Sequence, residues 1–163
     1  MTAHTRMLLI AAILAPLAAA QTRVPSVYKV DFTIRDSGDA GAKTGRKYSM
    51  VVNEHQRGTF RVGNRVPMAT SNTPGSTQFT YIDVGVNIDC TISEQDSKVA
   101  IHADLDLSSA VNAEKNINAN PTISQIKLNI DTTMLPAKPV IVAAFDDPVT
   151  SRKFEVEAMV TKQ

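Results

Sequence analysis

The stretch Phe79–Ser93 reads Phe-Thr-Tyr-Ile-Asp-Val-Gly-Val-Asn-Ile-Asp-Cys-Thr-Ile-Ser, and it decides the fold class. From Val84 onward every even position is apolar, whereas the odd positions carry polar residues or Gly. A period of two places the two sets on opposite faces of a sheet. The apolar phase is odd at Phe79 and Tyr81 and slips by one near Ile82 and Asp83, and this slip, with Gly85 close by, predicts a β-bulge. We therefore expect a long β-ribbon with one apolar and one polar face.

The same alternation recurs along most of the chain. One stretch, Val140–Ala144, is apolar on both faces, which predicts a central strand. The Asn- and Ala-rich segment Ala110–Asn120 is the one place whose composition allows a helical turn. Together these patterns predict an all-β fold: a single, mainly antiparallel domain of about eight strands, either a sandwich or a curved sheet with long β-hairpins. The further strands are expected at Val27–Arg35, Arg46–Asn53, Thr59–Val62, Lys98–Leu107, Ile126–Met134 and Phe154–Val160.

The first twenty residues have the features of a secretory signal peptide. Arg6 supplies a positive charge, residues 7–17 are apolar, and Ala18-Ala19-Ala20 provides small residues for cleavage. We therefore expect a signal peptide at 1–20, a β-domain at 21–163, and export to the periplasm or outer membrane of a bacterium. The chain has 17 Lys and Arg against 16 Asp and Glu, and removal of Arg6 makes these counts equal. This neutrality argues against nucleic acid as a partner, because that ligand requires a basic excess.

A search for chemical motifs finds little. His55 falls in a polar loop, and neither it nor His102 has a second His or Cys at a metal-ligand spacing. The pairs His102 with Asp104, and Glu155 with Glu157, each lie on one strand face and are interpreted as solvated charges. The single cysteine, Cys90, lies on an apolar strand face and is expected to be a buried, inert thiol. We expect no catalytic, cofactor-binding or metal-binding residues, no cofactor, and no enzymatic activity.

Four short segments, in order, resemble the C-terminal domain of bacterial secretins, the outer-membrane channels of type II and type III secretion and of type IV pilus systems. The hallmark among them is the stretch around Asp83, Val84 and Gly85. The chain departs from the family pattern at Pro136–Pro139 and at Ala143-Ala144, where secretins typically have an Asp-Gly turn and paired glycines. The four segments are Phe60–Pro67, Phe79–Ile88, Val99–Ser109 and Asn120–Ser124.

The resemblance implies an exported secretin-like β-domain that acts by protein–protein assembly in or beside an outer-membrane secretion or pilus system. Its partners would be other proteins or further copies of itself, joined by strand pairing, and contact with the outer membrane stays open. On this analogy the ribbon Gln78–Ser93 and the strand Thr122–Leu135 carry the assembly contacts. The alternative is a soluble periplasmic β-sandwich that binds a small or lipidic ligand, because a lipid-facing and a core-facing stripe alternate in the same way. A hydrolase that uses His102 and Asp104 is a distant third hypothesis.

Overall fold

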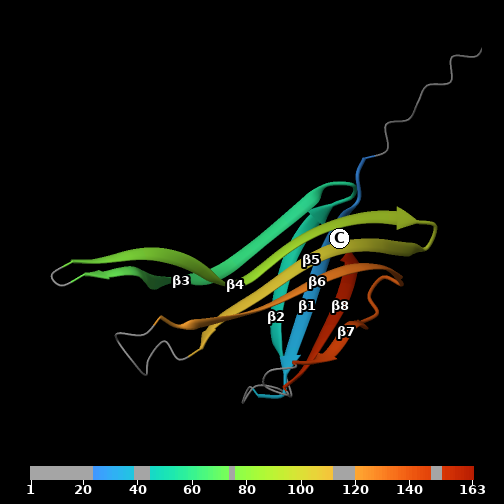
Figure 1. The fold of residues 1–163 in the computed structure, drawn as a ribbon. Helices are drawn as coiled ribbons and strands as arrows, with labels where there is room; N and C mark the ends of the chain where they lie inside the picture. Colours follow the sequence, from blue (N-terminus) through green and yellow to red (C-terminus); the bar gives the residue numbers. More distant parts are fainter. Residues whose placement is uncertain (1–23, 39–44, 74–75, 112–119, 148–151) are drawn as a thin grey trace, which may run out of the picture.

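The fold is all-β. The computed structural model describes residues 24–38, 45–73, 76–111, 120–147 and 152–163, and these form eight strands in two four-stranded sheets (Figure 1). Every pair of neighbouring strands is antiparallel. The described residues include no helix that is long and apolar enough to cross a membrane. The signal peptide expected at 1–20 and most of the helical turn expected within Ala110–Asn120 lie outside the described residues.

The two sheets are built from different parts of the chain. The short sheet joins the N-terminal and C-terminal strands in the order β2-β1-β8-β7, and the long sheet consists of the four central strands in the order β3-β4-β5-β6. The short sheet contains β1 (Val27–Asp36), β2 (Arg46–Asn53), β7 (Val140–Asp146) and β8 (Lys153–Lys162). The long sheet contains β3 (Arg57–Thr73), β4 (Ser76–Gln95), β5 (Lys98–Val111) and β6 (Thr122–Met134).

The apolar faces of the two sheets pack against each other as a β-sandwich. Along β4 the even residues Ile88, Cys90 and Ile92 are buried, as the alternation predicts, and Asp89 between them faces outward to contact Arg57. Side chains from two inner faces that interdigitate in this way form the usual core of a sandwich. The core comprises Tyr28, Val30, Phe32, Ile34, Val52, Ile88, Cys90, Ile92, Val99, Ile101, Ala103, Leu105, Ile130, Met134, Val156, Ala158 and Val160.

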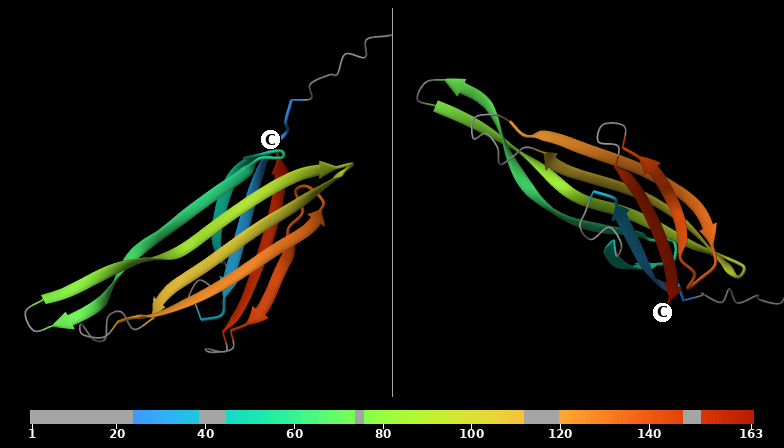
Figure 2. Two further views of the ribbon diagram at one scale, coloured as in Figure 1. Left: turned by 45° about the horizontal axis from the view of Figure 1, so that its top comes forward. Right: turned by 90° about the horizontal axis from the view of Figure 1, so that it is seen from below.

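The predicted long ribbon is confirmed, and it extends beyond the sandwich. β4 has 20 residues and pairs with β3 along nearly its whole length, but it pairs with β5 only from Val86 to Gln95. The outer halves of β3 and β4 therefore form a two-stranded arm, here defined as residues 63–73 and 76–85. Figure 2 shows this arm projecting from one end of the sandwich.

Two expectations about this topology are wrong. Val140–Ala144 was expected to be central, but β7 is the last strand of the short sheet, with Ile141 exposed. No β-bulge occurs near Gly85, because β3 and β4 stay in register from Arg57 to Ala69. The register shift in this pair lies between Ala69 and Ser71 instead. The break in alternation instead lies where β4 stops pairing with β5 and the arm begins.

The opposite faces of β4 predict opposite tolerance of substitution. We expect Ile88→Asp to lower the free energy of unfolding by more than about 3 kcal/mol, because it buries an unpaired charge in the core. Asp89→Asn keeps the shape of an outward residue and should cost less than about 1 kcal/mol. Urea denaturation followed by circular dichroism measures both values. Similar losses in the two variants would contradict the assignment of the faces.

Candidate functional site

Neither His55 nor His102, the two histidines that the structure describes, forms a catalytic or metal-binding arrangement. His102 Nε2 lies 3.9 Å from Asp104 Oδ2 and its Nδ1 lies 4.0 Å from Asp131 Oδ2, beyond the reach of a proton-transferring hydrogen bond. The amide of Asn129 donates to Asp104 at 2.7 Å instead. The described residues contain no group of three or more His, Cys, Asp or Glu side chains that could hold a metal ion. The hydrolase hypothesis therefore has no geometry to support it.

The other residues considered for chemistry have structural partners. Glu155 and Glu157 both face Arg35, whose guanidinium lies 2.7 Å from Glu155 Oε1 and 3.3 Å from Glu157 Oε2. These three side chains form a charged cluster on the outer face of the short sheet. The predicted burial of Cys90 is confirmed, and this burial raises the pKa of its thiol to about 12, which favours the less reactive neutral form.

Asp31 is a buried carboxylate that the sequence analysis did not single out. It lies on β1 and accepts a hydrogen bond from the Ser49 hydroxyl, with the ammonium groups of Lys47 and Lys29 at 3.1 and 3.4 Å. Burial by itself would raise the pKa of Asp31, but Ser49 and the two lysines outweigh it and hold the pKa below its ordinary value. This network ties β1 to the edge strand β2.

The lowered pKa of Asp31 predicts a pH-dependent contribution to stability. A carboxyl whose pKa is depressed by folding stabilises the folded state above the ordinary pKa, near 3.8, and loses this effect as the pH falls through the folded value. We expect Asp31→Asn to cost about 1–3 kcal/mol at pH 7 and progressively less below pH 3.8. Chemical denaturation at several pH values measures the difference. A penalty for Asp31→Asn that stays constant into acid would contradict this assignment, and the exposed Asp83→Asn serves as the control.

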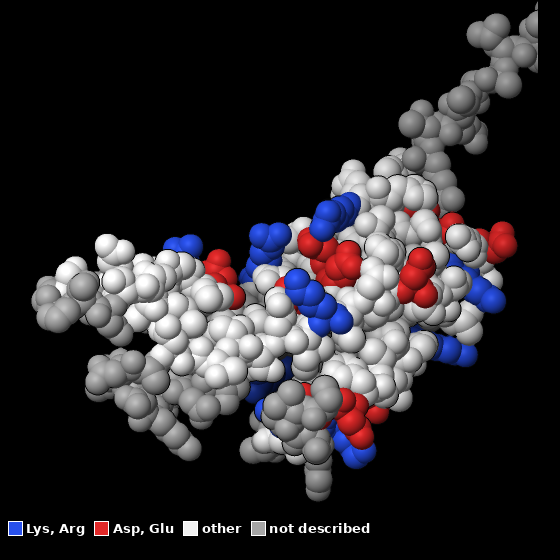
Figure 3. All heavy atoms as spheres, in the orientation of Figure 1, with Lys and Arg blue, Asp and Glu red and all other residues white. Residues whose placement is uncertain are grey.

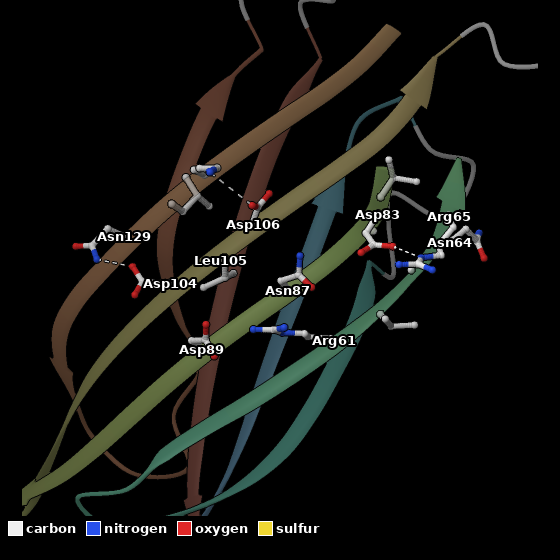
Figure 4. Close-up of a pocket in the computed structure, with 16 residues that line it drawn as sticks. Arg61, Asn64, Arg65, Asp83, Asn87, Asp89, Asp104, Leu105, Asp106 and Asn129 are labelled. Carbon is white, nitrogen blue, oxygen red and sulfur yellow. Dashed lines mark hydrogen bonds and ion pairs between the residues drawn. The ribbon is translucent and has the colours of Figure 1, made fainter. Parts of the chain in front are cut away.

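The outer face of the long sheet is polar and forms an open groove of about 730 Å³ (Figure 4). Three of its four carboxylates pair with a Lys or Arg: Asp89 with Arg57 at 2.7 Å, Asp83 with Arg65 at 3.0 Å, and Asp106 with Lys127 at 3.8 Å. Hydrogen bonds from Arg57 and Thr59 lower the pKa of Asp89 despite its partial burial. A face with this density of charge is suited to water or a polar surface, and a hydrocarbon chain would leave the ions unsolvated.

A pair of glycines lies at the point where the arm leaves the sandwich, which is here called the root of the arm. Gly63 and Gly85 lie opposite each other, and the backbones are so close that a Cβ on Gly63 would stand 2.1 Å from the Val84 carbonyl oxygen. Gly85 has a φ of +148°, which side chains rarely tolerate, and its N–H donates to the Ser108 hydroxyl at 3.0 Å. At this point β4 leaves β5, so the glycine pair separates the arm from the β5–β6 hairpin.

This geometry predicts that Gly85 is intolerant of a side chain. We expect Gly85→Ala to destabilise the fold by about 1–3 kcal/mol, because it combines an unfavourable φ with contact to the Val62 carbonyl oxygen. Asn64→Ala, one residue from Gly63, removes an exposed side chain and is the matched control. Urea denaturation compares the two variants. Equal stability of Gly85→Ala and Asn64→Ala would show that the close approach does not constrain the arm.

The arm carries no charge beyond its root. Between Arg65 and Asp83, which pair with each other, residues 66–82 include no Asp, Glu, Lys or Arg. Figure 3 shows that the charges on the visible face gather over the sandwich and the start of the arm. Phe79 and Tyr81 are both more than half exposed. Beyond the Arg65–Asp83 pair, the arm is therefore an uncharged ribbon with exposed aromatic rings.

The outer edge of β3 in the arm is partly occupied by a side chain. The amide of Asn120, just before β6, accepts from Ala69 N–H at 2.7 Å and donates to the Ala69 carbonyl at 2.8 Å. Two such bonds imitate the pairing of a neighbouring strand. This contact joins the arm to the β5–β6 hairpin close to the register shift at Ala69.

Among the described residues, each sheet ends in two strands that pair with another strand on one side only, namely β2 and β7 in the short sheet and β3 and β6 in the long sheet. Since β2 packs beside β3 and β6 beside β7, one side of the sandwich presents the edges β2 and β3 and the other presents β6 and β7. Each sheet has an even number of antiparallel strands, so its two edge strands run in opposite directions. A second copy placed edge to edge would therefore continue both sheets with antiparallel pairing.

Comparison with known proteins supports the fold and no closer relationship. No family model and no curated protein sequence matches the chain. Among solved structures it is similar to InvG, the secretin of the Salmonella SPI-1 type III secretion injectisome, with a TM-score of 0.52 and 8% identity over 85% of this chain and 63% of that one. It is also similar to the Escherichia coli K12 type II secretion system secretin GspD, with a TM-score of 0.53 and 10% identity over 85% of this chain and 48% of that one. A third similar structure is Aeromonas hydrophila ExeD, with a TM-score of 0.52 and 12% identity over 85% of this chain and 47% of that one.

At 8–12% identity these similarities establish a secretin-like fold. The chain spans less than two thirds of each of the three structures, with a coverage of 47–63% of their lengths. The fold expected from the segments around Asp83 and Gly85 and around Asn120 is thus confirmed.

Proposed function

We propose that this chain is an exported secretin-like β-domain that assembles with further copies of itself by strand pairing, in or beside an outer-membrane secretion or pilus system. It works through its surfaces as a structural component and not as an enzyme. The similarity to three secretin-like structures supports the fold on which this proposal rests. The exported location follows from the expected signal peptide at 1–20 and from the bacterial secretion systems to which the similar structures belong.

The observation that carries the proposal is the match between the two sides of the sandwich. One side offers β2 with β3 and the other offers β6 with β7, so a single head-to-tail contact extends both sheets together. Head-to-tail contacts use two different surfaces and generate a ring when the rotation between copies closes. A soluble monomer usually protects its edges with charges, proline or covering loops. Strand β7 reads Val-Ile-Val-Ala-Ala-Phe-Asp, so its protection is limited to one charge at its end, Asp146, and to the register shift between Ile141 and Ala143.

The similar structures include complexes with other proteins. InvG was determined with the basal body proteins PrgH and PrgK, and the enterotoxigenic Escherichia coli secretin GspD with the pilotin AspS. Strand addition and exposed ribbon surfaces would likewise allow this domain to contact a second protein besides its own copies. The uncharged arm, with Phe79 and Tyr81, is the part of the surface best suited to an apolar contact of that kind.

The ligand-binding alternative has less support. The two apolar faces close on each other, as that hypothesis expected, but they fill the core with side chains. The open groove on the long sheet is lined by paired charges such as Arg65 and Asp83, which suit neither an acyl chain nor another apolar ligand.

Self-association of the mature chain tests the proposal. We expect residues 21–163, purified in mild detergent, to form closed rings in negative-stain images and a multiple of the monomer mass by light scattering. Ile141→Lys places a charge on the exposed edge of β7 and should weaken association about tenfold, since it removes apolar burial and adds a desolvation cost. Val24→Lys, at an exposed residue ahead of β1, is the matched control. A strict monomer at high concentration, with and without detergent, would overturn the proposal.

A further inference from the structure

We infer that β2 of one copy pairs with β7 of the next copy in one specific register, in which Val51 lies opposite Ile141 and Lys47 lies opposite Asp146. This inference rests on the proposed head-to-tail assembly and names the partner of these two edges as a second copy of this chain. It is carried by the side chains that each edge presents, together with the register shift in β7.

Val51 and Ile141 are apolar residues on an otherwise polar surface. They are 64% and 56% exposed, and they lie at opposite edges of the outer face of the short sheet. Val51 pairs with Lys29, and Ile141 pairs with Glu157. Burying both residues against each other removes two isolated apolar side chains from water.

The register shift in β7 determines which of its residues share that outer face. Ile141 pairs with Glu157 but Ala143 pairs with Val156, so Val142 is the extra residue. After it, Ala144 and Asp146 pair with Glu155 and Lys153 and so return to the outer face. On β2 the corresponding outer residues are Val51, Ser49 and Lys47, which pair with Lys29, Asp31 and Thr33.

Aligning Val51 with Ile141 makes the remaining positions complementary on both faces. On the outer face, Ser49 falls opposite Ala144, and Lys47 opposite Asp146. On the inner face apolar residues meet throughout, since Val142 takes up the extra position: the pairs are Val52 with Val140, Met50 with Ala143, and Tyr48 with Phe145. Directly opposed pairs of this kind are the unit of sheet stabilisation.

The same register extends existing ion pairs into one row. Within each copy, Lys47 lies 3.1 Å from Asp31 and Lys153 lies 3.1 Å from Asp146. Joining the edges places Lys47 of one copy beside Asp146 of the next, so the charges alternate in sign along Asp31, Lys47, Asp146 and Lys153. Opposite charges directly across a strand pair are favourable, and like charges are unfavourable.

Neighbouring registers lack this match. A shift by two residues in one direction places Asn53 opposite Ile141 and Ser49 opposite Asp146. A shift in the other direction places Ser49 opposite Ile141 and Lys47 opposite Ala144. Each leaves Ile141 against a polar side chain and separates Lys47 from Asp146. Of these three registers, only the pairing of Val51 with Ile141 provides both the apolar pair and the ion pair.

Cysteine cross-linking of the full mature chain tests this register. Val51→Cys/Ile141→Cys should give a ladder of covalent oligomers on mild oxidation, whereas Asn53→Cys/Ile141→Cys, which reports the shifted register, should give at least about tenfold less. Within one copy the two sites are separated by β1 and β8, roughly 14 Å or more, so they cannot form an internal disulfide. The native Cys90 is buried and does not compete.

Variants with one introduced cysteine each test whether the cross-link joins Val51 of one copy to Ile141 of another. A mixture of Val51→Cys and Ile141→Cys chains should yield dimers and no larger species, and neither variant alone should cross-link. Cross-linking of Val51→Cys alone, or equal yields for the two double variants, would overturn the register. Light scattering of the same samples before oxidation shows whether they assemble. Assembled chains without the Val51–Ile141 cross-link disprove the register and leave the proposed function standing, whereas monomers disprove both.

A charge exchange gives an independent readout. Lys47→Glu and Asp146→Lys should each weaken self-association about two- to five-fold, as expected for loss of an exposed ion pair. The double variant should recover part of the lost affinity, because it restores opposite charges across the contact, while each new side chain lies beside a like charge of its own copy, Asp31 or Lys153. Additive losses in the double variant would count against the pairing of Lys47 with Asp146.

Discussion

The mutual burial of two apolar sheet faces holds this protein together. The described residues form strands and connections without a helix to cover a sheet, and the single cysteine excludes an internal disulfide. Each sheet alone would expose a row of large side chains, such as Phe32 on β1 or Ile92 on β4, so neither is stable without the other. The long sheet is formed by consecutive hairpins, whereas the short sheet requires β1 to meet β8 from the far end of the chain. The sandwich therefore closes only when nearly the whole described sequence is in place.

On the polar outer faces of the sandwich, charged side chains form ion pairs. Asp31, Asp89 and Asp106 each have a cationic partner, and these ion pairs keep the outer faces suited to water. Exposed apolar side chains lie instead at the edge of β7, where Ile141 is exposed, and on the uncharged part of the arm beyond Arg65, at Phe79 and Tyr81. Exposure of these apolar residues to water does not stabilise a monomer. The proposed assembly accounts for this distribution, since these are the surfaces that a neighbouring copy or another protein would cover.

Much of the fold follows from local patterns. The alternation from Val84 to Ile92 predicts which side chains enter the core, because successive residues of a strand point to opposite faces. It predicts the burial of Ile88 and Cys90 and the outward position of Asp89. The exposed position of His102 and Asp104 also follows from the local pattern, because residues two apart lie on the same face of a strand. The position of Val140–Ala144 could not be inferred in this way. Periodicity reports whether the faces of a strand are apolar, but not whether a strand lies on each side of it. An edge strand with Ile141 exposed and a central strand give the same sequence pattern.

The sequence by itself determined the all-β class, the long ribbon, the inward and outward faces and the likeness of its short segments to secretins. Only the tertiary structure decided the strand order, the edge positions of β2, β3, β6 and β7, the separation of the arm at Gly63 and Gly85, and the contact of Asn120 with Ala69. The physical reason is that side-chain periodicity is a property of each strand alone. Edges and arms depend instead on which backbones pair across long separations in sequence, and on a close backbone approach that requires Gly63 and Gly85 to lie opposite each other.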